Sequence, residues 1–193
     1  MLSLEESLKI LKETKALLEG HFILSSGLHS PKYVQCAQLM SKPHKANKIC
    51  ESLAEKIKKE IPDFDIILSP AMGGIIIGYE IGRLLKKETI FSERVNGKFQ
   101  LRRDFKIKKD SKVLIIEDVI TTGKSSLECS KLVTSNQGFI IGYACLINRS
   151  DGKSQIKSKI ISQVELNIPT FSKENLPKEL SSLNPVKPGS RNL

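Results

Sequence analysis

The chain has 193 residues, enough for one domain with a hydrophobic core, and a formal net charge of +10. No apolar run approaches the roughly 20 residues of a membrane span, the N-terminus lacks a signal-peptide pattern, and the four cysteines lack the spacing of a zinc site. The lysines are scattered and not interleaved with aromatic residues, so we expect neither a membrane nor a nucleic acid as partner. Dispersed cysteines favour a reducing cytoplasm.

In chain order, the predicted elements alternate between helices and strands. A capping-box pattern at Ser3 predicts a first helix, which Gly20 would end. Residues 21–36 predict two short strands around a Ser-Ser-Gly turn, and Pro43 opens a second helix. The further expected elements are strands over 65–69, 89–92, 113–117, 139–148 and 159–166 and helices over 75–85 and 125–135. This alternation predicts an α/β domain, with a mostly parallel sheet and helices on both faces.

A basic hairpin is expected between the strands over 89–92 and 113–117. Asn96-Gly97 is a strong signal for a two-residue turn. The segment is polar and has no apolar stripe to bury, so we expect it to project into solvent and to be mobile over about 93–106. Its candidate functional cations are Arg94, Lys98, Arg102 and Arg103.

The most informative segment is the apolar strand over 113–117, which runs into two adjacent carboxylates, Glu117 and Asp118. A ligand in an open α/β sheet binds just past the C-terminal end of such a strand. The turn that follows offers hydroxyls, backbone N–H groups and the start of a helix, which suit a phosphate. Carboxylates suit sugar hydroxyls or a hydrated Mg²⁺ ion. Together these features predict a site for a phosphorylated ribose.

Two alternatives compete for this segment. Gly123-Lys124-Ser125 spells part of a nucleotide-binding P-loop, but the glycine that this motif needs five residues earlier is Asp118 here. A structural turn without any ligand is disfavoured, because ionised carboxylates at the edge of a core are costly unless they have partners.

The same residues resemble a known family. The segment from Glu117 to Gly123 resembles the phosphoribosyl pyrophosphate motif of type I phosphoribosyltransferases. Residues 22–33 are similar to the FxLxSGxxSxxY segment of the orotate phosphoribosyltransferases. Arg149 stands where that family places an orotate-binding arginine, and residues 187–191 resemble the C-terminus of one bacterial branch. The resemblance covers essentially the whole chain.

The resemblance implies the type I phosphoribosyltransferase fold, with a small N-terminal hood and a projecting basic hairpin. It implies one domain over 1–193, with hood segments over about 1–40 and 160–193. It also implies a homodimer with shared active sites. The reaction would transfer ribose 5-phosphate from 5-phosphoribosyl 1-pyrophosphate (PRPP) to orotate. Mg²⁺ would be held mainly by PRPP, with Asp118 as a further candidate ligand.

The resemblance also implies a role for each matched residue. The PRPP-binding residues would be Glu117, Asp118, Val119, Ile120, Thr121, Thr122, Gly123, Lys124 and Ser125. Orotate would contact Thr121, Arg149, Ser26 and Gly27, and pyrophosphate would contact the loop Ala71, Met72, Gly73 and Gly74. Asp118, Arg94 and Lys98 would be catalytic, with Arg102 and Arg103 as further cations of the mobile loop.

The chain departs from the family pattern at three places. Many orotate enzymes carry a lysine where Ser25 stands, a second lysine where Gly73 stands, and an Arg-Lys pair where Glu93-Arg94 stands. Two other functions stay open. One is a phosphoribosyltransferase for a purine or uracil. The other is a regulatory RNA-binding protein on the same fold, which the basic charge would favour.

Overall fold

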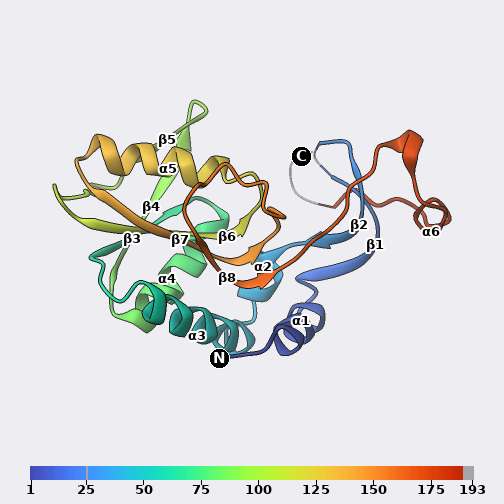
Figure 1. The fold of residues 1–193 in the computed structure, drawn as a ribbon, viewed down its shortest axis with the longest axis horizontal. Helices are drawn as coiled ribbons and strands as arrows, with labels where there is room; N and C mark the ends of the chain where they lie inside the picture. Colours follow the sequence, from blue (N-terminus) through green and yellow to red (C-terminus); the bar gives the residue numbers. More distant parts are fainter. Residues whose placement is uncertain (25, 189–193) are drawn as a thin grey trace.

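The computed structural model describes residues 1–24 and 26–188, and a twisted sheet forms its centre (Figure 1). Within these residues the sheet has six strands in the order β5-β4-β3-β6-β7-β8. All neighbours are parallel except β5, which pairs antiparallel with β4. The strands are β3 (Ile66–Pro70), β4 (Glu88–Val95), β5 (Lys98–Leu101), β6 (Lys112–Ile120), β7 (Phe139–Asn148) and β8 (Ile160–Glu165). The mostly parallel sheet predicted from the sequence is confirmed.

Helices cover both faces of this sheet (Figure 1). On one face α1 (Leu4–Glu13), α3 (Pro43–Glu60) and α4 (Gly73–Leu85) pack on a core that includes Leu11, Leu53 and Ile77. On the other face α5 (Lys124–Ser135) packs through Cys129 and Val133. The strand β6 runs between the two cores, and its residues from 113 to 116 are fully buried, as a continuous apolar run predicts. No helix in the described part of the chain is long and apolar enough to span a membrane.

A small hood lies beside the sheet. It consists of the antiparallel strands β1 (Leu17–Ile23) and β2 (His29–Val34), followed by α2 (Cys36–Met40). The C-terminal segment returns to both edges of this pair, because Phe171 bridges to His29 and Val186 bridges to Phe22. It includes the short helices η1 (Lys173–Asn175) and α6 (Lys178–Ser181). The hood and its tail therefore form one unit built from the two ends of the chain (Figure 1).

Three expectations about this architecture were wrong. The helix α1 is capped at Thr14 and the chain turns at Lys15, whose φ is +60°, so Gly20 lies inside β1 and does not end the helix. Burial of Ala16 and Leu17 in the core explains the early turn. The second hood segment does not begin at residue 160, because β8 pairs with β7 in the central sheet.

The third wrong expectation is that the hairpin has no apolar residues to bury. The turn at Asn96-Gly97 does connect β4 to β5, as predicted. However, Phe99 is buried and Phe105 packs edge-on against Phe91 at a ring separation of 5.1 Å. The hairpin therefore carries apolar residues that anchor its base to the sheet.

Candidate active site

The two carboxylates at the end of β6 occupy different surroundings. Glu117 is 8% exposed, and the Ser126 hydroxyl donates a hydrogen bond to its Oε2. Burial raises the pKa of Glu117 to about 7, although the Ser126 hydrogen bond opposes that rise. Burial also raises the pKa of Asp118, against hydrogen bonds from the backbone N–H groups of Val119 and Asp118. Both carboxylates would therefore gain from ligand hydroxyls or a cation that favours their charged form.

The turn after β3 lies directly against Asp118. The helix α4 begins at Gly73, where an added Cβ atom would lie 2.6 Å from Asp118 Oδ2. Glycine at this position therefore leaves room for the carboxylate in this orientation. A larger side chain at this position would displace it. The structure thus brings the expected pyrophosphate loop and the acidic pair together.

The hydroxyl-rich turn joins β6 to α5. Gly123 has a φ of +77° and lies immediately before Lys124, the first residue of α5. Thr121 and Thr122 are exposed, and Thr122 Oγ1 accepts a hydrogen bond from Lys124 N at 3.4 Å. Backbone N–H groups at the start of α5 and the positive end of its dipole favour an anion at this turn. Since the Ile120 side chain is buried in the core, Ile120 can serve such a ligand only through its backbone.

A cavity of about 1290 Å³ lies between this turn and the hood. Of the predicted site residues, it brings together Ser26, Thr121, Thr122 and Arg149. Gly27 and the pyrophosphate loop are not part of its lining. Ser25 and residues 189–191 lie outside the described residues, so the departure at Ser25 and the end of the C-terminal resemblance have no structural account.

Arg149 has the least satisfied side chain in this cavity. Its Nε atom is buried and has no hydrogen-bond partner among the described residues. Burial lowers the pKa of the guanidinium, and Tyr33 partly opposes that effect. Because a buried polar group without a partner is costly, this arrangement favours an anionic ligand at Arg149.

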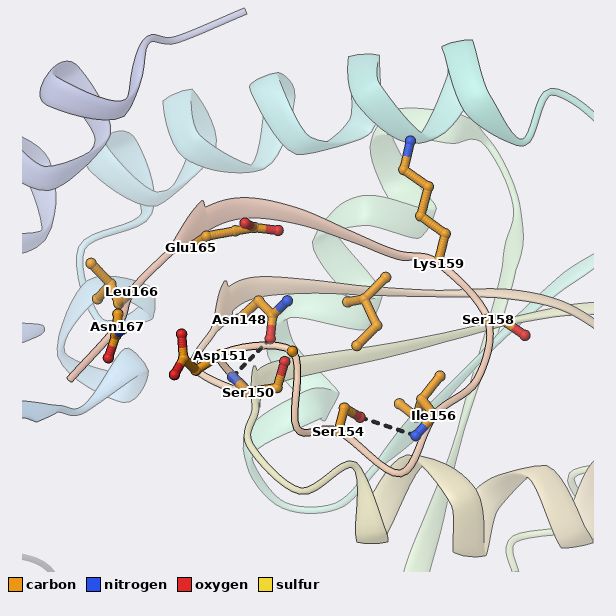
Figure 2. A pocket seen from close by; sticks show the side chains of 12 residues that line it. Asn148, Ser150, Asp151, Ser154, Ile156, Ser158, Lys159, Glu165, Leu166 and Asn167 are labelled. Carbon is orange, nitrogen blue, oxygen red and sulfur yellow. Dashed lines mark hydrogen bonds between the residues drawn. The ribbon is translucent and has the colours of Figure 1, made fainter. Parts of the chain in front are cut away.

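The loop after β7 holds Arg149 beside the hydroxyl-rich turn. Arg149 N donates to Ile120 O at 2.8 Å, and Gln155 N donates to Thr122 O at 2.9 Å. Figure 2 shows two further bonds within the loop, from Ser150 N to Asn148 Oδ1 at 3.0 Å and from Ile156 N to Ser154 Oγ at 3.1 Å. The smaller cavity in that view, about 540 Å³, shares Ser150, Asp151 and Asn167 with the larger one. The loop is thus held by hydrogen bonds to the turn after β6 and by hydrogen bonds of its own.

The hairpin cations lie apart from this cavity. Arg94 pairs with Glu128 of α5 at 2.7 Å, and its guanidinium lies 4.1 Å from the centre of the Phe99 ring. Glu93 pairs with Arg102 at 3.1 Å and with Arg103 at 2.6 Å. Lys98 is exposed near the tip. No hairpin cation is among the residues that line the cavity in the described chain.

Two residues of this candidate site, Ser126 and Tyr33, were not predicted from the sequence. Ser126 holds Glu117, and its position one residue beyond the hydroxyl-rich turn was the available signal. Tyr33 lines the cavity and interacts electrostatically with Arg149. It is the last residue of the FxLxSGxxSxxY segment, so the motif itself contained the signal.

Comparison with known proteins places these features in a family. The family model of the phosphoribosyl transferase domain matches residues 40–178. An orotate phosphoribosyltransferase of Parvibaculum lavamentivorans is 45% identical over 190 residues, covering 98% of each chain. A protein of the same name from Methylorubrum populi is 46% identical and covers 98% of this chain and 97% of its own.

Solved structures share the fold. Orotate phosphoribosyltransferase from Aeropyrum pernix superposes with a TM-score of 0.71 at 23% identity, over 82% of this chain and 92% of its own. Adenine phosphoribosyltransferase from Thermoanaerobacter pseudethanolicus superposes with a TM-score of 0.62 at 20% identity, over 70% and 88%. At such identities the structures support the architecture, and the base specificity has to come from the site.

Proposed function

Because the chain belongs to the orotate phosphoribosyltransferases, within the phosphoribosyl transferase domain family, we propose that it converts orotate and PRPP to orotidine 5′-monophosphate and pyrophosphate. The step is part of pyrimidine nucleotide synthesis, in which the product leads to UMP. We take residues 1–193 as one phosphoribosyltransferase domain. The choice of base rests on one observation: beside Thr121 and Thr122, the buried Nε of Arg149 has no hydrogen-bond partner among the described residues.

The assigned groups suit the transfer of ribose 5-phosphate to a base. The turn from Thr121 to Ser125 holds the 5′-phosphate at the start of α5. Glu117 and Asp118 accept hydrogen bonds from the ribose hydroxyls. Arg149 binds the orotate carboxylate, which its planar fork can engage with two hydrogen bonds. As the bond to pyrophosphate breaks, the sugar becomes cation-like and the leaving group gains negative charge, so catalysis rests on electrostatic stabilisation.

The residues present fit a Mg²⁺ ion that the substrate largely holds. In the described part of the chain no three His, Cys, Asp or Glu side chains cluster tightly enough for a metal ion. Asp118, against Gly73 of the pyrophosphate loop, offers one carboxylate beside the expected diphosphate. Mg²⁺ usually binds one or two carboxylates together with substrate phosphates, and there it would neutralise the charge of the leaving pyrophosphate.

A homodimer with shared sites is part of the proposal. Met72, Ile76 and Tyr79 lie along one side of α4 and are 82%, 55% and 65% exposed. Such an apolar stripe at helical spacing favours a protein interface, and Met72 belongs to the pyrophosphate loop itself. The distance of the hairpin cations from their own cavity supports a hairpin that serves the partner's site. All four cysteines are free, which supports the cytoplasm as the compartment.

The test combines a panel of bases with variants of Arg149. With Mg²⁺ and PRPP, the wild type should turn over orotate and not adenine, hypoxanthine or uracil. Arg149→Ala should raise the KM for orotate far more than that for PRPP, since losing one partner of a desolvated charge pair costs about 2–5 kcal/mol. Arg149→Lys should recover only part of the loss, because a lysine lacks the planar fork.

Either of two results would count against this assignment. Turnover of another base without orotate would refute the substrate. Equal weakening of both substrates in Arg149→Ala would remove Arg149 as the orotate anchor while leaving the reaction in place.

A further inference from the structure

Two buried histidines form a direct pair in the hood. His21 on β1 and His29 on β2 are 5% and 7% exposed, and His21 Nε2 lies 2.6 Å from His29 Nδ1. The other nitrogen of His21, Nδ1, lies 3.0 Å from the carbonyl oxygen of Leu183 in the C-terminal tail. The strand register shifts between Glu19 and Phe22, so His21 lies in a bulge. One chain of hydrogen bonds thus crosses from the tail through β1 to β2.

The partners determine where the protons lie. A carbonyl oxygen only accepts, so His21 Nδ1 must carry a proton. In a neutral His21 the Nε2 atom then accepts, and His29 Nδ1 must donate to it. One added proton can be accommodated, but two charged rings would place N–H against N–H. The pair is therefore intact only when at least one of the two rings is neutral.

The pair lies where three of the hood segments that line the cavity are attached. Leu24, Ser26 and Leu28, which line the cavity, belong to the connection between the two histidines. Thr170 precedes Phe171, whose N–H and carbonyl both bond to the backbone of His29 at 2.8–2.9 Å. Lys187 follows Val186, whose N–H donates to His21 O at 2.8 Å. A change in the distance between the two rings would therefore move these three segments, whereas Tyr33, Val34 and Gln35 line the cavity from the other end of β2.

We propose that His21 and His29 are positioning residues for the base end of the active site. The hydrogen bond between the two rings, with its defined proton positions, sets the spacing of β1, β2 and the tail. It thereby sets the width of the cavity between the hood and Arg149. The 5′-phosphate turn belongs to β6 and α5 and does not depend on the pair. This inference rests on the proposed function, since it assigns the hood side of the cavity to orotate.

Two substitutions of His29 test the proposal. His29→Leu removes the donor and leaves His21 Nε2 buried without a partner, whereas His29→Asn places an amide N–H near the position of Nδ1. We expect His29→Leu to raise the KM for orotate about tenfold or more, with the KM for PRPP changed less than about twofold. His29→Asn should stay within about threefold of wild type for both substrates. His44→Leu, at an exposed position on α3, is the matched control and should change neither KM.

The wild-type protein provides a second, independent measurement. Imidazole ¹⁵N NMR should find His21 as the Nδ1–H tautomer, the less common form, with its Nε2 as acceptor. An Nε2–H tautomer of neutral His21 would overturn the pair. A parallel rise of both KM values in His29→Leu, an unchanged KM for orotate, or equal effects of Leu and Asn would overturn its positioning role. If His29→Leu does not fold, His29→Gln, whose amide reaches beyond the Nδ1 position, takes its place. Failure of the wild type to use orotate would refute the proposed function, and the tautomer result would still stand.

Discussion

At the level of single residues, Glu117 is a carboxyl group whose ionised form is disfavoured by burial. Its carboxyl is buried beside Asp118 and has the Ser126 hydroxyl as its hydrogen-bond partner. The rise of its pKa from 4.5 to about 7 corresponds to about 3 kcal/mol between the two protonation states. The folded protein therefore holds this proton more tightly than the unfolded chain does. Its contribution to stability is present below pH 4.5 and is lost as the pH rises towards 7.

The direction of this pKa shift predicts the behaviour of Glu117→Gln. Without ligands, Glu117 lowers the unfolding free energy of the wild type between about pH 5 and 7, and the variant should not show this decrease. At pH 8 the variant should be more stable by about 2–3 kcal/mol, while its activity is lost. Denaturant titrations of the variant and the wild type give the unfolding free energies at pH 5 and at pH 8. Glu5→Gln, on the exposed side of α1, serves as control. If the unfolding free energy of Glu117→Gln fell between pH 5 and 7 as it does in the wild type, folding would not raise the pKa of Glu117.

At the level of elements, the β4–β5 hairpin divides its charges between structure and solvent. Arg94 contacts Glu128 on α5, the Phe99 ring and the Gly97 carbonyl oxygen, so it ties the hairpin to the body of the domain. Glu93 binds Arg102 and Arg103 together at the hairpin base. Lys98, near the tip, is exposed and closest to the turn. Arg94 and Lys98, both expected to be catalytic, therefore differ in what they do for the hairpin.

Substitution should separate these two cations. Arg94→Ala should destabilise the hairpin by about 1 kcal/mol, through loss of one ion pair and one cation–π contact, and should lower activity. Lys98→Ala should lower activity with no change in stability. Hydrogen exchange of the Phe99 amide reports the local opening, and Glu128→Gln should reproduce part of the Arg94 effect. If Arg94→Ala loses activity while Phe99 exchange stays as in the wild type, Arg94 acts on the substrate directly.

At the level of the whole molecule, the cavity and the hairpin of one chain do not meet. The cavity opens between the hood and the C-terminal ends of β6 and β7, whereas the hairpin extends from the β4–β5 edge of the sheet. The exposed stripe of Met72, Ile76 and Tyr79 offers an apolar surface next to the pyrophosphate loop. A two-fold pairing through this stripe is the arrangement we propose for bringing each hairpin to the other chain's site.

Complementation between inactive chains tests this arrangement. Asp118→Asn would be mixed with a chain carrying Lys98→Ala and Arg102→Ala, which leaves the Arg94 contacts intact. Shared sites predict recovery of about a quarter of wild-type activity, since random pairing puts half the chains in mixed dimers with one working site of two. A Tyr79→Glu chain, monitored by sedimentation, controls for the interface. No recovery after verified subunit exchange would mean that each chain builds its own site.

Local features of this protein were readable from the sequence. The buried run of β6, the acidic pair at its end and the hydroxyl-rich turn before α5 are contiguous, so periodicity and turn chemistry identify them together. The Asn96-Gly97 turn was equally local. The end of α1 was misjudged because burial of Ala16 and Leu17, and not the next glycine, decides where that helix stops.

Only the tertiary structure decided how distant residues meet. Ser26, Thr121 and Arg149 reach one cavity, Gly73 contacts Asp118, and His21 bonds both His29 and the tail at Leu183. These contacts join positions separated by up to 162 residues. Sequence patterns report the backbone preference and the buried face of each segment. The order of strands in the sheet, and the return of the tail to the hood, follow from which of those faces can be buried together.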